Sequence, residues 1–162
     1  MKTSKQISYP EEKSLLTQIA EIQVSYHPHF RATERPQITQ SKDAYSILID
    51  NWDNDTIELK EHFKVLLLNR ANRVLGVYEV SSGGMAGTVV DPKLIFGIAL
   101  KAGASYLVLS HNHPSGNLKP STEDINITKK LEAAGKLLDL LIIDHLIVTS
   151  TGYLSFQDEG LM

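Results

Sequence analysis

The amino-acid sequence predicts an α/β domain in which helices flank a mixed β-sheet. Segments with helical spacing of apolar residues alternate with short β-rich runs, in the order helix, β-hairpin, helix, strand, helix, hairpin. The 162 residues are 42% hydrophobic, which is enough for one well-buried core. We therefore expect one domain over residues 41–162, preceded by an N-terminal extension over residues 1–40.

The first half of the chain contains three predicted elements. Within the extension, Ala20 to Pro28 (AEIQVSYHP) alternate loosely and have the pattern of one strand. Ser41 is a suitable N-cap for a helix in SKDAYSILIDNWD, whose apolar residues fall at helical spacing and leave Trp52 in the core. Two β-rich runs in EHFKVLLLNRANRVLGVYEVSS are joined at Asn69 to Asn72, which is typical of a hairpin.

The second half begins with the clearest helix boundaries of the sequence. In DPKLIFGIALKAGA, Asp91 is the predicted N-cap, Pro92 the first helical residue and Gly103 the C-terminal stop. Residues 105–110 (SYLVLS) predict a strand that is buried on both faces. An amphipathic helix follows, with core positions expected at Ile125, Thr128, Leu131 and Leu138, and two strands around residues 149–152 close the chain.

Composition and charge exclude several classes of function. Sixteen basic and nineteen acidic side chains give a net charge of −3, so no overall positive field attracts a nucleic acid. The sequence shows no signal-peptide pattern, and no apolar run approaches the roughly 18 residues that span a bilayer, so we expect a cytoplasmic protein with no membrane partner. The chain has no cysteine, so any metal must be held by histidine and carboxylate side chains.

The stretch HNHPSGNLKPSTED, residues 111–124, is the candidate metal site. In an extended chain, residues i and i+2 point to the same side, so His111 and His113 can present both imidazoles to one point. Asp124 lies in the first turn of the next helix, where a carboxylate is favoured and where it could return to that point. Two histidines and one carboxylate are typical of a catalytic site that keeps a position open for water.

Two simpler interpretations compete with the metal site. A His-x-His sequence followed by Pro, Ser and Gly also occurs in ordinary solvated turns. Ser121 with an acid three residues later approximates a capping box, although Asp124 is shorter than the usual Glu or Gln and its reach back to the cap should be poorer. That shortness favours a different role for Asp124.

The spacing His111-x-His113-Pro114, six residues, Ser121, two residues, Asp124 resembles the JAMM motif of JAB/MPN domains. The surrounding LSHNHPSGNLKPSTEDINITKKL and IIDHLIV resemble the bacterial RadC family, whose members have been labelled DNA repair proteins, and the likeness covers residues 41–162. The resemblance implies a JAB/MPN fold, which has a cytidine-deaminase-like architecture. It also implies an upstream glutamate near the start of a strand, for which Glu61 fits better than Glu58 or Glu79.

The resemblance implies a zinc-dependent hydrolase of amide bonds, a metallopeptidase that binds one Zn²⁺ and acts on a protein or peptide. The metal would be held by His111, His113 and Asp124. Glu61 would accept a proton from the activated water and pass it to the leaving amine. Ser121 would donate its hydroxyl to the developing oxyanion, an interaction of roughly 2.7 to 4 kcal/mol in such sites.

Three other functions were weighed against the hydrolase. A zinc nucleobase deaminase has a related architecture but needs a cysteine pair that this chain lacks. A DNA-repair-associated accessory or binding domain without peptidase activity rests on the family label alone. A scaffold with a dead site is disfavoured because every position of the motif is present. His145, in an apolar run, is expected to be a buried, hydrogen-bonded histidine rather than a ligand.

Overall fold

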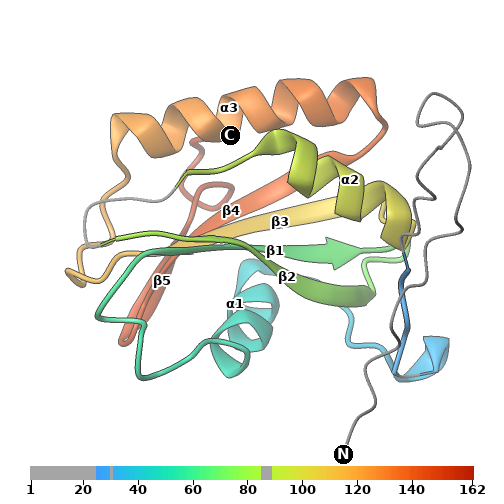
Figure 1. The fold of residues 1–162 in the computed structure, drawn as a ribbon, viewed down its shortest axis with the longest axis horizontal. Coiled ribbons are helices and arrows are strands. Elements are labelled where there is room, and N and C mark those ends of the chain that lie inside the picture. Colours follow the sequence, from blue (N-terminus) through green and yellow to red (C-terminus); the bar gives the residue numbers. More distant parts are fainter. Residues whose placement is uncertain (1–24, 30, 85–88) are drawn as a thin grey trace, which may run out of the picture.

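The structure is a computed structural model that describes residues 25–29, 31–84 and 89–162. Its elements follow the predicted order and confirm the mixed α/β fold (Figure 1). In chain order they are the short 3-10 helix Ala32–Glu34, α1 Ser41–Asp50, β1 His62–Leu68, β2 Val74–Ser82, α2 Pro92–Ala102, β3 Tyr106–Asn112, α3 Thr122–Leu137, β4 Leu141–Thr149 and β5 Gly152–Ser155. No helix in these described ranges is long and apolar enough to cross a bilayer.

The five strands form one sheet in the order β2-β1-β3-β4-β5. Neighbouring strands are antiparallel except for β3 and β4, which run parallel. A parallel pair needs a crossover connection, and α3 supplies it. The C-terminal end of β3 and the first turn of α3 therefore lie at the same end of the sheet (Figure 1).

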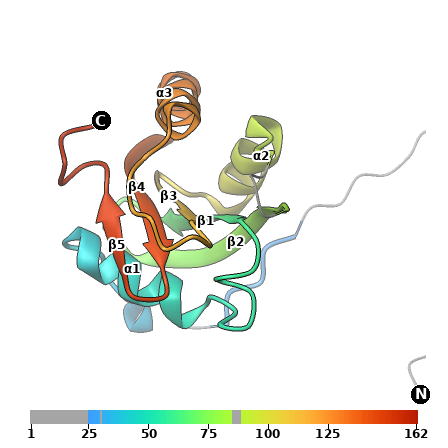
Figure 2. The ribbon, with the colours of Figure 1, turned by 90° about the vertical axis from the view of Figure 1, so that its left-hand side faces the viewer.

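Helices cover both faces of the sheet. Helices α2 and α3 lie on one face and α1 on the other (Figures 1 and 2). Because side chains alternate along a strand, β1 serves both layers. Val65 and Leu67 pack in the core under α2 and α3, whereas Leu66 and Leu68 pack with α1 and Trp52. Strand β3 is likewise buried on both faces, as the sequence predicts.

The predicted boundaries of α2 are confirmed. The Asp91 carboxylate accepts a hydrogen bond from the Lys93 backbone N–H at 2.9 Å, and Pro92 is the first helical residue. Gly103 ends the helix in the left-handed conformation, with φ of 67°, which glycine adopts without steric cost.

The expected N-cap of α1 is off by one residue. Gln40 is the N-cap and Ser41 is the first helical residue. The reason is Asp43, whose carboxylate accepts hydrogen bonds from the backbone N–H groups of Thr39 and Gln40 at 2.8 and 3.2 Å. This acidic side chain at the third helical position binds the backbone of the two residues before Ser41, so the helix starts at Ser41 with Gln40 as its cap.

Two further expectations need correction. The expected strand over residues 20–28 falls partly outside the described residues, and residues 25–28 have no regular secondary structure. Leu138 is not a core position of α3, because the helix ends at Leu137 and Leu138 is the exposed C-cap. Gly135 is buried on that side of the helix instead, and the chain turns so that Leu140 enters the core.

Candidate metal centre

Strand β3 carries the two histidines to the end of the sheet. His111 is 1% exposed and lies in β3, whereas His113 follows the strand and is partly buried. Their Nε2 atoms are 2.9 Å apart, so the i and i+2 positions bring both imidazoles to one point, as expected. The Phe63 ring from β1 stacks on His111 with the ring centroids 6.2 Å apart, which restricts the orientation of the imidazole.

The first turn of α3 brings Asp124 to the same point. Its Oδ1 atom lies 3.2 Å from His111 Nε2, and its Oδ2 atom lies 3.6 Å from His113 Nε2. The capping box is also complete, because the Ser121 N–H donates to Asp124 Oδ2 at 2.7 Å and Ser121 Oγ accepts from the Asp124 N–H at 3.1 Å. The expectation that aspartate reaches the cap poorly is therefore wrong. One carboxylate caps the helix and faces the histidines.

These three side chains fit a metal ion. Their ligand atoms lie within 4.8 Å of one another, and they are the group of this kind found among the described residues. Tetrahedral Zn–N bonds of about 2.0–2.1 Å place two ligand nitrogens about 3.3 Å apart, close to the separations seen here. The Nδ1–H of His113 donates to the Asn117 carbonyl, so the lone pair of a neutral His113 is on Nε2, which faces the other ligands.

The charges of the site are strongly coupled. Burial alone would raise the pKa of Asp124, but hydrogen bonds with His111 and His113 outweigh it and hold that pKa well below its usual range. The hydrogen bond with Asp124 raises the pKa of His113 against the opposing effect of burial. The centre therefore combines an ionised carboxylate with two imidazoles, which bind a cation in their neutral form.

Glu61 lies immediately before β1 and belongs to the same electrostatic environment. Partial burial raises the pKa of its carboxyl group, while His111 and His113 lower it through their charges. Its backbone is held on both sides by Gly83 and Gly84, at 2.8 and 3.2 Å. A carboxyl group with a raised pKa beside a metal-ligand set is suited to exchanging protons.

The two rival glutamates have other partners. Glu58 accepts a hydrogen bond from the Ser150 hydroxyl, at the turn between β4 and β5. Glu79 lies in β2 opposite Lys64, with its carboxylate 3.2 Å from His62 Nδ1 and 3.6 Å from Lys64 Nζ. Lys64 also contacts Trp52 on the α1 side of the sheet, so Glu79 faces away from the layer of α2 and α3.

Asn112 fixes the loop that carries Glu61, a role that the sequence did not indicate. It points away from the two histidines and is fully buried. Its amide donates to the Ile57 and Lys60 carbonyls at 2.6 and 2.9 Å, and its oxygen accepts from the His62 N–H at 2.7 Å. These three bonds tie the end of β3 to the residues on both sides of Glu61.

Ser121 is exposed at the N-terminus of α3, beside the carboxylate of Asp124. Its oxygen accepts the Asp124 N–H, and this leaves the hydroxyl proton available for donation. A donor at this position is compatible with the role implied by the motif.

His145 is buried and hydrogen-bonded, as the sequence predicts, but its partner could not be foreseen. It lies in β4, and its Nε2 atom is 2.8 Å from Nδ1 of the ligand His111. Burial is the main cause that lowers the pKa of His145 well below its ordinary value. Thr128 of α3 contacts the other ring nitrogen, at 2.6 Å.

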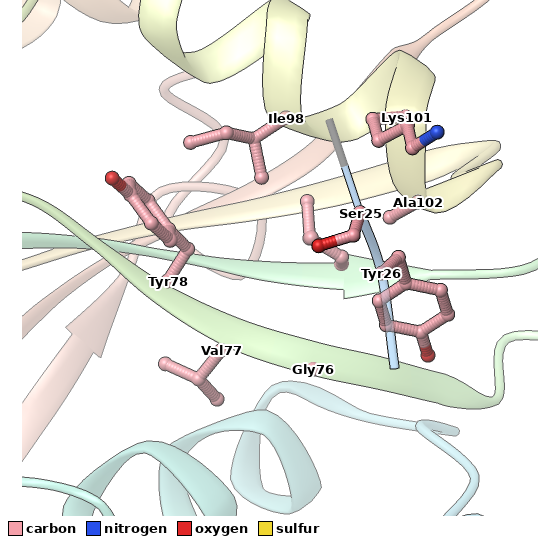
Figure 3. A pocket seen from close by; sticks show the side chains of 9 residues that line it. Ser25, Tyr26, Gly76, Val77, Tyr78, Ile98, Lys101 and Ala102 are labelled. Atoms are coloured by element: carbon pink, nitrogen blue, oxygen red, sulfur yellow. The ribbon is translucent and has the colours of Figure 1, made fainter. Parts of the chain in front are cut away.

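An apolar cavity of about 200 Å³ lies between α2 and β2, away from the metal centre (Figure 3). The residues around it include Tyr26, Gly76, Tyr78 and Ile98, and the Tyr26 hydroxyl donates to the Leu75 carbonyl. Gly76 pairs with Leu67 of β1, and His111 pairs with Phe63 of the same strand. Leu67 and Phe63 are four residues apart, which corresponds to about 13 Å along the strand. The cavity is therefore separate from the ligand set.

Comparison with known proteins agrees with this geometry. The RadC-like JAB domain family matches residues 38–161, a range that includes the three candidate ligands and Glu61. A UPF0758 protein of Flavobacterium johnsoniae is 50% identical over 126 residues, which are 77% of this chain and 53% of that protein. A UPF0758 protein of Salinibacter ruber is 40% identical over 80% of this chain and 54% of its own length. A UPF0758 protein of Alkaliphilus metalliredigens is 41% identical over 64% of this chain and 44% of its own length.

The chain spans about half the length of the curated relatives it matches. The family match covers more than half of this chain, and the five-stranded sheet with its three α-helices is consistent with that family. The chain belongs to the RadC-like JAB domain family.

Proposed function

We propose that this chain is a zinc-dependent hydrolase of amide bonds, in peptides or in isopeptide linkages. The observation that carries the proposal is the convergence of His111, His113 and Asp124, whose charges also act on the carboxyl group of Glu61. Domains of the JAB/MPN type are usually peptidase-related, which agrees with this chemistry.

Zinc is the metal that suits the ligand set best. Imidazole nitrogens with a single carboxylate favour zinc over Mg²⁺ and Ca²⁺, which prefer sites made of oxygen ligands. Three protein ligands also match the number found in catalytic rather than structural zinc sites. When bound, the ion would supply Lewis-acid polarisation of the amide carbonyl and would lower the pKa of a water molecule.

The raised pKa of Glu61 and its charge interactions with His111 and His113 support its assignment as the general base. It would take a proton from the attacking water and deliver it to the nitrogen of the leaving amine. The C–O bond would form as water adds to the carbonyl and gives its proton to Glu61, and the C–N bond would break as Glu61 passes that proton to the amine, so one carboxylate serves both transfers. The three hydrogen bonds of Asn112 to the surrounding backbone would keep Glu61 in place during the reaction.

Ser121 would support the developing negative charge. Its hydroxyl proton is available for donation because Ser121 Oγ accepts the Asp124 N–H. Removing one such donor typically reduces kcat by 10² to 10³, or roughly 2.7 to 4 kcal/mol. Ser121 would therefore combine helix capping with transition-state stabilisation.

Metal analysis of purified variants tests the proposed centre. The unsubstituted chain, loaded with Zn²⁺ and dialysed, should retain about one zinc per chain, and His111→Ala and Asp124→Ala should lose it. His27→Ala is the control, because His27 is an exposed histidine outside the ligand set. Stoichiometric zinc in both ligand variants would refute the assignment.

Activity is tested separately, on peptide libraries and on isopeptide-linked substrates. Cleavage should require zinc, should stop with a chelator and should return when zinc is added back. Because the chain spans about half the length of its relatives, the assay should include a full-length relative as a second enzyme source. Zinc-independent cleavage by the purified chain would contradict the proposal.

A further inference from the structure

His145 is completely buried and contacts a polar atom at each ring nitrogen. Its Nε2 atom lies 2.8 Å from His111 Nδ1, and its Nδ1 atom lies 2.6 Å from Thr128 Oγ1. Thr128 Oγ1 in turn lies 2.6 Å from the backbone carbonyl oxygen of Asp124. The chain of contacts therefore begins at one ligand, passes through β4 and α3, and ends at the backbone of another ligand.

The direction of these hydrogen bonds follows from the chemistry of their ends. A carbonyl oxygen can only accept, so the single hydroxyl proton of Thr128 lies between Oγ1 and the Asp124 carbonyl. The Thr128 oxygen must then accept at its other contact. His145 is consequently the donor there, through Nδ1–H.

The same reasoning continues to His111. His145 is 0% exposed, and neither of its ring partners is a carboxylate, so the neutral imidazole is favoured and carries one proton. With that proton on Nδ1, the Nε2 atom of His145 has a lone pair and accepts from His111 Nδ1–H. In a neutral His111 this leaves the lone pair on Nε2, the atom that faces His113 and Asp124 and that a metal ion would bind.

We propose that His145 and Thr128 are positioning residues whose one-way hydrogen-bond relay holds His111 in the Nδ1–H tautomer and reserves His111 Nε2 for the metal ion. The inference rests on the metal centre proposed above. A relay in the opposite direction would put a proton on His111 Nε2 and compete with metal binding. Partners of this kind behind ligand histidines typically change metal affinity by 10- to 100-fold when mutated.

Thr128→Val is the decisive variant, because valine keeps the shape of threonine and removes only the hydroxyl. Titration with Zn²⁺ by calorimetry should show affinity about 10- to 100-fold weaker than that of the unsubstituted chain. Thr128→Ser should restore most of the affinity, because serine keeps the hydroxyl.

Thr149→Val is the matched control. Thr149 is also a buried threonine whose hydroxyl donates to a carbonyl, that of Gly152 at 3.1 Å, but it does not contact the relay. A merely structural role for Thr128 predicts that both valine variants bind zinc alike. Equal zinc affinity in Thr128→Val and Thr149→Val would overturn the proposal.

The tautomer of His111 can be measured without metal, by long-range ¹H–¹⁵N correlation spectra of the metal-free protein. His111 should be protonated at Nδ1, and Thr128→Val should weaken that preference. A His111 with an unprotonated Nδ1 in the unsubstituted chain would refute the relay. Failure of the unsubstituted chain to bind Zn²⁺ would instead refute the proposed function, and the spectra would still decide the hydrogen-bond direction.

Discussion

Asp124 performs two tasks with one carboxyl group. One oxygen accepts the N–H of Ser121 and caps α3, while the other lies 3.2 Å from His111 Nε2. Because helix N-termini favour negative charge, the position stabilises the ionised carboxylate that a metal needs. The local rule of helix capping and the chemistry of the site therefore select the same residue, and helix formation itself places the ligand.

Glu61→Gln should separate proton transfer from metal binding. Glutamine keeps the shape of glutamate but cannot accept the proton, so zinc should remain stoichiometric while kcat falls by about 10²- to 10⁴-fold. Elemental analysis and single-turnover assays on a cleaved substrate measure the two effects. Glu58→Gln is the control, because Glu58 contacts Ser150 instead, and it should retain nearly full activity. Full activity in Glu61→Gln would exclude Glu61 as the base.

At the scale of the element, α3 closely approaches the chain that leads into β4. A Cβ atom added at Gly135 would lie 2.2 Å from the Leu140 carbonyl oxygen, a backbone atom that cannot move aside freely. Only glycine fits at position 135, because a side chain there would collide with the backbone of Leu140. The same close approach lets Leu140 fill the core under α2 and α3.

Gly135→Ala should destabilise the fold by about 1–3 kcal/mol, the usual cost of overpacking. Denaturant unfolding followed by circular dichroism measures the change. Gly97→Ala is the matched control, because Gly97 is an exposed residue of α2 with no atom near the added Cβ. It should leave stability unchanged or raise it by up to about 1 kcal/mol. Equal effects of the two substitutions would contradict the packing argument.

The cap of α1 predicts a pH dependence. Hydrogen bonds from Thr39 and Gln40 lower the pKa of Asp43 below its model-compound value of 3.8. Because the pKa of Asp43 is lower in the folded than in the unfolded protein, its ionised carboxylate stabilises the folded state at any pH above the unfolded-state pKa. This stabilisation is lost as the pH falls through the folded-state pKa. Asp43→Asn should therefore lower the Tm at pH 7, and the difference from the unsubstituted chain should shrink below about pH 4. If the Tm difference between the two proteins stayed constant down to pH 2, the charge of Asp43 would not contribute to stability.

At the scale of the whole molecule, the charge of the sequence argues against a tight DNA contact. The net charge is −3, and the longest run of basic residues is the pair Lys129 and Lys130 on α3. We expect DNA to be, at most, a weak partner of this chain, with binding that falls steeply as salt is added.

Fluorescence anisotropy with single-stranded and duplex DNA tests this expectation. Dissociation constants at physiological salt should be larger than micromolar. The double variant Lys129→Glu, Lys130→Glu should abolish the residual binding at low salt. Sub-micromolar affinity for any DNA form at physiological salt would contradict the prediction. It would favour the DNA-associated function over the hydrolase as the main role.

Local rules were sufficient for much of the fold and for the pairing of the two candidate histidine ligands. Pro92 and Gly103 mark the ends of a helix because each has its own backbone restriction, and the structure has both in place. His111 and His113 share a side because the strand has a period of two. These features depend only on residues that are close in sequence, and the sequence by itself therefore determined them.

The tertiary structure decided everything that depends on how distant segments pair. His145 reaches His111 because β4 lies parallel to β3 with Leu109 opposite His145, a register that no local pattern specifies. Glu79 faces α1 because of its pairing with Lys64, although its sequence pattern also allowed the other side. Leu138 is not in the core because α3 ends at Leu137, where Gly135 lies against the backbone of Leu140. Each outcome is set by strand order, register or close approach, and these depend on the packing of the whole chain rather than on the preferences of a segment.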